Sequence, residues 1–290
     1  MIVAVLWISA FDCGRFTVSF YDFQSKKIKK PLRFVFLSDL HCKMFGFEGT
    51  FLLEKIKELS PDMILIGGDM ITAHPRSSTE TTERFLKNLS ETGIPVFYGI
   101  GNHELRLMIY PETYGDKWEK YKKAVEKTGI RIYENDSAHI PEAGINLISF
   151  SPDKSYYKRL KKVVMEPRYI EEKTGVLDKD NFNILLAHNP AFFEAYTEYG
   201  ADLILSGHVH GGLVRIPVPV SKKKRLEGAH VMRGVVSPGF RLFPRYDAGK
   251  FCSGEKTMLV SRGLGSHTIH LRVFNPAELM VIDLKPQGGV

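Results

Sequence analysis

The chain contains the stretch LRFVFLSDLH at residues 32–41, in which a short apolar segment leads directly into a polar turn. The apolar run at 32–37 predicts a buried strand. Asp39 and His41 follow where that strand ends. The same order, an apolar strand followed at once by Asp, Asn or His, recurs along the chain and indicates both the fold and the chemistry.

Short apolar runs alternate with helical patterns over most of the sequence. Strands are predicted at 32–37, 63–66, 95–100, 146–150, 183–187, 202–206, 257–260 and 279–284, and helices at 50–59, 77–93 and 191–199. Residues 105–129 predict one surface helix, and residues 153–175 a polar, basic insertion. The alternation favours an α/β layered fold, and the strand-rich end favours a mixed second sheet. We expect one domain over 31–290, preceded by an apolar segment and a leading strand at 1–30.

Composition excludes several classes of protein. With 43% hydrophobic and 25% charged residues, the chain is neither disordered nor fibrous. The 40 Lys and Arg residues against 33 Asp and Glu residues give a net charge of +7, which favours an anionic partner such as nucleic acid, a lipid headgroup or a phosphate ester. Three scattered cysteines, Cys13, Cys42 and Cys252, form no disulfide framework or CxxC pair, which is typical of a reducing compartment.

The first ten residues are apolar apart from one serine. They are too few to span a bilayer, which takes about 20 apolar residues, and they lack the basic flank and cleavage site of a signal peptide. Three interpretations stay open for them: a capping segment, a shallow membrane contact or a trimmed anchor. We expect a cytoplasmic or membrane-associated protein.

Five polar segments each follow a predicted strand. They are SDLH at 38–41, GGD at 67–69, GNHE at 101–104, AHN at 187–189 and SGHVHGG at 206–212. Because ligands bind at the carboxyl ends of strands in open α/β sheets, these segments can converge on one place. Taken singly, the aspartates suit helix caps and the His-x-His pair suits a solvated turn. Five of the ten histidines fall in these segments, however, and that joint occurrence favours a site.

The residue types in these segments indicate a metal. Carboxylates, imidazoles and one amide, without a thiolate, suit Mn²⁺, Fe or Zn²⁺ better than Ca²⁺ or an iron–sulfur cluster. Six or seven such ligands exceed the need of one tetrahedral ion. A pair of ions about 3.5–4 Å apart would use them all.

In these motifs the sequence resembles the calcineurin-like metallophosphoesterase superfamily. The resemblance rests on the order Asp-x-His, Gly-Asp, Gly-Asn-His-Glu, His and Gly-His-x-His between Asp39 and His210. The tail VSRGLG at 260–265, followed by Arg272 and NPAE at 275–278, is similar to a bacterial phosphodiesterase branch related to the YkuE and YaeI proteins. The resemblance covers nearly the whole chain from about Arg15. It implies a four-layer α/β/β/α sandwich with two mixed sheets.

The resemblance also implies roles for individual residues. It assigns Asp39, His41 and His210 to a first divalent ion, Asp69 to a bridge between two ions, and Asn102, His188 and His208 to the second ion. A bridging hydroxide would attack phosphorus in line. His103 would protonate the leaving oxygen or stabilise the phosphoryl group.

Glu104, the residues after Asp69, and Cys42 carry expectations of their own. Glu104 either orients His103 or is a solvated loop acid. Many relatives have an acid shortly after the bridging aspartate, whereas Met70, Ile71 and Thr72 stand here, so a hydrogen bond from that position is in doubt. Cys42 is expected to pack inward.

Positive charge gathers in basic runs at 26–30, 158–162 and 222–225, which suit solvated faces or contact with an anionic lipid or polymer. Arg241, Arg245 and Tyr246 are candidate contacts of an anionic phosphoester substrate, although Tyr246 suits the core equally well. No specific nucleic-acid motif is present. The oligomeric state is open.

The sequence therefore predicts a metal-dependent phosphodiesterase. The alternatives are a phosphomonoesterase, including a protein phosphatase, a nuclease, and a non-catalytic anion- or membrane-binding protein that keeps the fold.

Overall fold

The computed structural model describes residues 2–157, 163–218, 232–237, 242–267 and 269–288. Its helices are α1 (Ile2–Gly14), α2 (Thr50–Leu59), α3 (Glu80–Ser90), α4 (Asn102–Ile109), α5 (Pro111–Tyr114), α6 (Lys117–Glu126), α7 (Pro167–Thr174) and α8 (Phe193–Tyr199), with 3₁₀ turns η1 (Phe47–Gly49), η2 (Lys154–Tyr157) and η3 (Pro190–Phe192).

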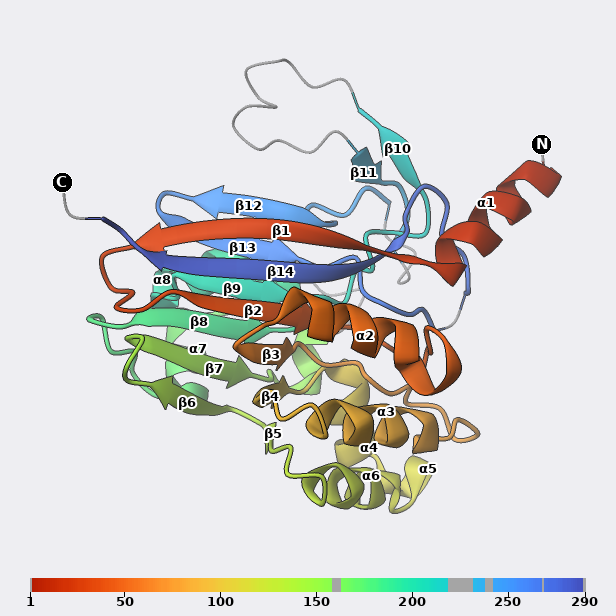
Figure 1. Cartoon of the computed structure of the whole chain (residues 1–290), viewed down its shortest axis with the longest axis horizontal. Coiled ribbons are helices and arrows are strands. Elements are labelled where there is room, and N and C mark those ends of the chain that lie inside the picture. The colour runs from red at the N-terminus through yellow and green to blue at the C-terminus, as the bar shows by residue number, and fades with distance from the viewer. Residues whose placement is uncertain (1, 158–162, 219–231, 238–241, 268, 289–290) are drawn as a thin grey trace.

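Two six-stranded sheets form the centre of the molecule. The first has the order β1 (Phe16–Ser25), β14 (Ala277–Pro286), β2 (Leu32–Leu37), β3 (Met63–Ile66), β4 (Val96–Gly99), β5 (Ile132–Tyr133). The second has the order β12 (Gly249–Ser253), β13 (Lys256–Val260), β9 (Leu203–Ser206), β8 (Phe182–Ala187), β7 (Ile145–Phe150), β6 (Asp136–Ile140). A small hairpin joins β10 (Arg215–Pro217) to β11 (Met232–Gly234). Figure 1 shows the strands of both sheets running across the molecule, with α2 and α3 in front of them.

Three apolar cores separate four layers. One core packs α2, α3 and α6 against the first sheet, through residues such as Ile56, Phe85 and Tyr121. A second lies between the two sheets and includes Phe36 and Leu186. A third packs α7 and α8 against the second sheet. Each strand of the sandwich interior is therefore covered on both faces, which explains why the sequence shows continuous apolar runs rather than alternation.

Both sheets are mixed, as expected. Strands β2, β3 and β4 are parallel to one another, and so are β7, β8, β9 and β13. Strand β14 runs antiparallel to β2, and β1 runs parallel to β14 along its whole length. Strands β1 and β14 therefore begin at the end of the sheet where β2 finishes. The segments preceding them, α1 and the residues before 277, lie at that same end.

Most expected elements coincide with observed ones within two residues, for example β2, α2, β3 and β8. The single surface helix expected at 105–129 is wrong. The segment forms α4, α5 and α6, because Pro111 begins a new helix and Gly115 adopts a positive φ of 63° between α5 and α6. It also contributes to the core, since Trp118, Tyr121 and Val125 are buried.

The N-terminal apolar segment is longer than its first ten residues. It forms α1 up to Gly14, and β1 follows at once. Among the described residues, no helix is long and apolar enough to cross a bilayer. The division of the chain at residue 30 stays a prediction.

Candidate metal centre

The loops after the strands β2, β3, β4, β8 and β9 carry the predicted ligands, and these loops meet at one end of the sandwich, which we call the metal edge. Five of the predicted ligand positions have a left-handed backbone: Asp39 (φ 54°), His41 (48°), Asp69 (54°), His208 (69°) and His210 (53°). Non-glycine residues adopt this conformation rarely and at a cost of about 1–3 kcal/mol each. Such strain concentrated at one place is typical of a functional site.

Asp39, His41 and His210 form one buried group whose ligand atoms all lie within 4.8 Å of one another. Nε2 of His210 is 3.2 Å from Oδ1 of Asp39 and 3.3 Å from Nε2 of His41. The backbone N–H of His208 donates to the Asp39 carboxylate, which ties the loop after β9 to the loop after β2.

Asp69, His188 and His208 form a second group, in which Asp69 and His188 are buried and His208 is partly exposed. Oδ2 of Asp69 lies 3.0 Å from Nε2 of His188 and 4.0 Å from Nε2 of His41, so this carboxylate lies between the two groups. Oδ1 of Asn102 is buried without a hydrogen-bond partner. An unpartnered buried oxygen costs about 1–3 kcal/mol unless something binds it.

The histidine hydrogen bonds fit a bound cation. Nδ1 of His188 lies 2.8 Å from the carbonyl oxygen of Gly67, and Nδ1 of His210 lies 3.1 Å from that of Gly265. A carbonyl only accepts, so each Nδ1 carries a proton, which leaves each Nε2 as the atom that a cation could bind. Nε2 of His188 has no hydrogen-bond partner although Asp69 is 3.0 Å away.

The charges at this centre also call for a cation. Burial lowers the pKa of His188, but the charges of Asp69 and Asp39 outweigh it and raise the pKa to about 10. Burial likewise raises the pKa of Asp69, yet His188 and His103 hold it well below its ordinary value. Two divalent ions would supply this positive charge, and the donor set of imidazole, carboxylate and amide suits them.

His103 has the opposite hydrogen-bond polarity. Its Nδ1 accepts from the backbone N–H of Ala73 at 2.8 Å, so the neutral ring carries its proton on Nε2, 4.0 Å from Oδ2 of Asp69. Burial lowers the pKa of His103 to about 4, although the charge of Asp69 acts in the other direction. His103 therefore presents an N–H donor beside the two groups, whereas His188 and His210 use Nδ1–H for carbonyl oxygens and have Nε2 left for a cation.

Neither expectation for Glu104 is correct. The side chain is fully buried, and its oxygens accept from the backbone N–H groups of Asp69, Met70 and Gly101 and from the Tyr98 hydroxyl. Its hydrogen bonds thus hold the turn that carries Asp69 rather than the ring of His103. Burial and the charge of Asp69 raise the pKa of Glu104 to about 7.

Thr72, which lies in the stretch after Asp69 where many relatives have an acid, contacts a predicted ligand. Oγ1 of Thr72 lies 3.4 Å from Nδ1 of His41, so a hydroxyl stands beside that ligand. Cys42 is partly buried against the first core, as expected, and its thiol donates to the carbonyl oxygen of Ser78.

Arg272 and Asn275, in the tail similar to the phosphodiesterase branch, support the ligand loops. Nδ2 of Asn275 donates to the carbonyl oxygens of His210 and Gly212 at 2.8 and 2.6 Å. The buried guanidinium of Arg272 donates to three carbonyl oxygens between residues 262 and 265. These residues fix the backbone from which His210 projects.

Sequence reasoning missed His267. Its ring centroid lies 4.7 Å from that of His41 and 4.8 Å from that of His103, and the three form a further candidate ligand group. The signal was present, because His267 belongs to the polar segment after β13, a strand parallel to β9. The rule that identified the other five segments applies to this sixth one.

Of the three candidate substrate contacts, Arg245 and Tyr246 are not part of these groups. Arg241 lies outside the described residues. Arg245 and the hydroxyl of Tyr246 both contact Oε1 of Glu194, at 2.7 and 3.0 Å. The Tyr246 ring is buried in the third core against Phe193 and Phe251, as its core interpretation implies. A contact with substrate stays a prediction for all three.

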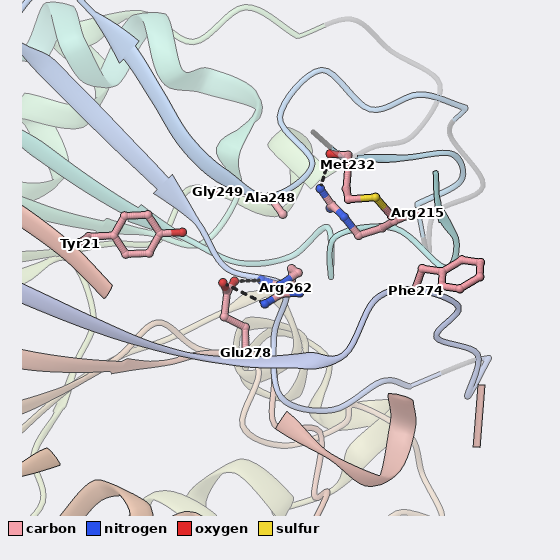
Figure 2. Close-up of a pocket in the computed structure, with 8 residues that line it drawn as sticks. All are labelled: Tyr21, Arg215, Met232, Ala248, Gly249, Arg262, Phe274 and Glu278. Atoms are coloured by element: carbon pink, nitrogen blue, oxygen red, sulfur yellow. Dashed lines mark hydrogen bonds and ion pairs between the residues drawn. The ribbon is translucent and has the colours of Figure 1, made fainter. Parts of the chain in front are cut away.

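A cavity of about 260 Å³ lies between β1, β12 and the β10–β11 hairpin. Figure 2 shows Arg262 paired with Glu278 across it and the Tyr21 hydroxyl pointing towards that pair. Its second arginine, Arg215, pairs with Asp247 at 3.2 Å. Both guanidinium groups are thus neutralised, and none of the lining residues belongs to the ligand groups.

The metal edge of this α/β/β/α sandwich gathers carboxylate, imidazole and amide groups that can bind metal ions. This fold and this set of groups define the class of metal-dependent phosphoester hydrolases. The chain belongs to the calcineurin-like phosphoesterase family, whose model matches residues 32–212, more than half of the sequence.

Curated relatives of this chain are similar over most of its length. The uncharacterized protein YpbG of Bacillus subtilis is 26% identical, over 91% of this chain and 85% of its own. The uncharacterized metallophosphoesterase Cj0846 of Campylobacter jejuni is 28% identical over 91% of this chain, which spans 62% of that protein's length. The phosphodiesterase YaeI of Escherichia coli is 25% identical, over 81% of this chain and 76% of its own.

Proposed function

We propose that this protein is a phosphodiesterase whose centre holds two divalent ions, drawn from Mn²⁺, Fe and Zn²⁺. The observation that carries the proposal is the pair of buried ligand groups that meet at Asp69, with the unpartnered Asn102 oxygen beside them. Asp39, His41 and His210 would hold one ion, and His188, His208 and Asn102 the other. Asp69 would contact both.

When bound, the two ions would lower the pKa of a water molecule to make it the nucleophile, and would stabilise negative charge on the phosphoryl oxygens. The chain's own residues do the rest. His188 and His210 each donate Nδ1–H to a carbonyl oxygen, which keeps each Nε2 aimed at the centre. The Glu104 carboxylate and the Asn275 amide fix the backbone of Asp69 and His210.

His103 would act as the catalytic donor. The Ala73 N–H fixes its tautomer, so Nε2–H is available to the leaving oxygen of the ester. A neutral imidazole can donate this hydrogen bond at neutral pH, which is the state that its lowered pKa favours.

A diester is favoured over a monoester by the similarity to a relative named as a phosphodiesterase. The test compares bis(p-nitrophenyl) phosphate with p-nitrophenyl phosphate after the chelated protein is reloaded with Mn²⁺. We expect a higher kcat/KM for the diester. Equal or reversed values would favour the phosphomonoesterase, including a protein phosphatase.

The rival from another class is a non-catalytic protein that binds anions or membranes. Metal analysis separates the two, because the proposal requires close to two ions per chain. An Asp69→Asn variant should lose both metal and hydrolysis, since it removes the carboxylate next to both groups. Undiminished hydrolysis in that variant would contradict the proposal.

A further inference from the structure

Helix α1 has the reverse of the usual orientation. The side chains of Ser9 and Asp12 are buried, with Asp12 only 2% exposed, whereas Leu6, Trp7 and Phe11 face outward with Trp7 74% exposed. A surface helix of a water-soluble domain normally buries its apolar side and exposes its polar one. An outward apolar face of this kind suits an apolar medium or partner.

Buried polar contacts hold α1 in this orientation. The backbone N–H of Asn275 donates to Oδ2 of Asp12 at 2.9 Å, and that of Arg272 donates to Oγ of Ser9 at 3.2 Å. These are the two tail residues that support the metal-ligand loops. The outward apolar face is thus fixed relative to the metal centre.

Other apolar side chains are exposed at the same end of the molecule. Phe47 and Phe51, on η1 and the first turn of α2, are 82% and 64% exposed and follow the carboxyl end of β2. Phe274 is exposed just before β14 begins. We call these three residues and the outer face of α1 the apolar rim. Figure 1 shows α1 and the start of α2 at this end of the sheets.

Charge on the rim suits an anionic surface. The described segments 2–15, 38–51, 261–267 and 269–276 contain three acidic residues. Asp12 is buried and paired with Arg15, Asp39 is buried among the ligands, and Glu48 pairs with Arg84. Lys43, over the Phe45 ring at 5.7 Å, and Arg15, which stacks on the Phe11 ring at 4.5 Å beside its partner Asp12, are basic neighbours of these apolar side chains. Aromatic and aliphatic side chains with basic neighbours are typical of helices that lie in a membrane interface.

We propose that the apolar rim rests on an anionic lipid bilayer, and that the metal centre acts on a phosphoester anchored in that bilayer. The second half rests on the function proposed above. A bilayer fits better than a second protein, because exposed aromatic and aliphatic side chains beside basic residues are the composition typical of helices that lie in a membrane interface. A membrane covers the rim and supplies the substrate from the same side.

The first test is sedimentation with vesicles of phosphatidylcholine containing roughly one third phosphatidylglycerol. The wild-type protein should sediment with them, and a Leu6→Glu/Trp7→Glu variant should partition at least about tenfold more weakly, because two apolar anchors become charged. The matched control is Val176→Glu. Val176 is 79% exposed and precedes β8, at the end of the sandwich opposite the metal edge, so this variant should bind as the wild type does.

A second variant, Phe51→Glu, comes from an independent segment and should also weaken sedimentation. It keeps the test decisive if the α1 variant does not fold. Failure of the wild-type protein to sediment, or unchanged sedimentation of both variants, would overturn the proposal. So would a dimer that forms without vesicles and that the α1 variant dissociates, since a second copy would then be what covers the rim.

The proposal that the substrate is anchored in the bilayer is tested with two diesters that share a leaving group. Soluble bis(p-nitrophenyl) phosphate should be hydrolysed equally by the wild type and the Leu6→Glu/Trp7→Glu variant. Hexadecyl p-nitrophenyl phosphate held in the vesicles should be hydrolysed about tenfold more slowly by the variant. An equal rate on the vesicle-held diester would overturn this half. Vesicle binding without hydrolysis of either diester would contradict the proposed function and support the docking surface.

Discussion

Single residues at the metal edge combine backbone strain with restrained side chains. Asp39, His41, Asp69, His208 and His210 all have positive φ, a conformation that Asp and His adopt more readily than most residues but still at a cost. Each is held in place by bonds from neighbouring loops, such as the Glu104 carboxylate on the Asp69 N–H. Hydrogen bonds from several loops therefore fix these backbone positions, so the candidate ligands are already arranged for an ion.

Replacing His103 with Asn should lower kcat for the diester by about 10²–10⁴-fold, because it removes the positioned donor. Metal content should stay unchanged, because the role proposed for His103 is that of an Nε2–H donor. Loss of an ion in this variant would instead indicate a ligand in the candidate group with His41 and His267. Steady-state kinetics and metal analysis of the same preparation measure both quantities. Full activity in this variant would refute the proposed role.

Replacing His267 with Asn should lower kcat/KM by about tenfold, because its ring lies beside those of His41 and His103. The matched control is His270→Asn, a change of an exposed histidine on the same loop. Kinetics of the two variants under identical metal loading make the comparison. Equal rates in both would leave His267 without a part in the reaction.

At the scale of elements, the segment between β13 and β14 supports the centre without supplying one of the expected ligands. Arg272 and Asn275 bind carbonyl oxygens of the ligand loops and the polar side of α1. Burial lowers the pKa of Arg272 to about 10, so the guanidinium stays charged at neutral pH. This segment links the helix, the tail and the His-x-His turn.

Replacing Asn275 with Ala should weaken metal binding by about 10–100-fold, the usual effect of removing a group that orients a ligand. The amide would no longer hold the carbonyl oxygens of His210 and Gly212. Calorimetric titration of the chelated protein with Mn²⁺ measures the change. The control is Asn181→Ala, which removes another buried asparagine, near the start of β8, and should leave metal affinity intact.

Strands β2 and β14 carry an ion pair that should make stability depend on pH. Arg33 and Asp283 are direct cross-strand partners joined by two hydrogen bonds of 2.7 and 2.9 Å. The Arg33 hydrogen bonds lower the pKa of Asp283, more than its burial raises it. The folded state therefore binds this proton less readily than the unfolded state does. The stabilisation is present above the ordinary aspartate pKa and disappears as pH falls through the lowered one.

Because Arg33 is partly exposed, the pair should contribute only about 0.5–1 kcal/mol. Asp283→Asn should lower the free energy of unfolding by that amount at pH 7 and by nothing once the carboxyl is protonated. Urea unfolding at neutral and acidic pH compares the two proteins. A deficit of equal size at both pH values would contradict the electrostatic explanation.

At the scale of the whole molecule, metal binding should stabilise the fold, because the ligands come from both sheets. An ion at 100 times its dissociation constant contributes about 2.7 kcal/mol, which for a chain of 290 residues corresponds to a rise in Tm of about 4 °C. Calorimetry of the chelated protein before and after addition of Mn²⁺ measures this rise. In Asp69→Asn the rise should be much smaller, and an equal rise would contradict the assigned ligands.

Much of the fold was predictable because the interior is covered on both faces. Buried strands such as β2 and β8 appear in the sequence as unbroken apolar runs, and α8 ends at Gly200 with the left-handed backbone that glycine favours. The three helices between 102 and 126 were not predictable in the same way. Their buried residues, including Trp118 and Tyr121, are spaced among lysines and glutamates that resemble a surface helix.

The sequence by itself predicted most of the residues that the structure brings together at the metal edge, because polar residues directly after parallel apolar strands lie at the same end of their sheet. Tertiary structure alone decided what each side chain does there. Glu104 binds the Asp69 turn, His267 joins from a sixth strand end, and α1 turns its apolar face outward. The reason is physical: such roles depend on hydrogen-bond direction and burial between segments distant in the chain, and local patterns of residues do not encode either one.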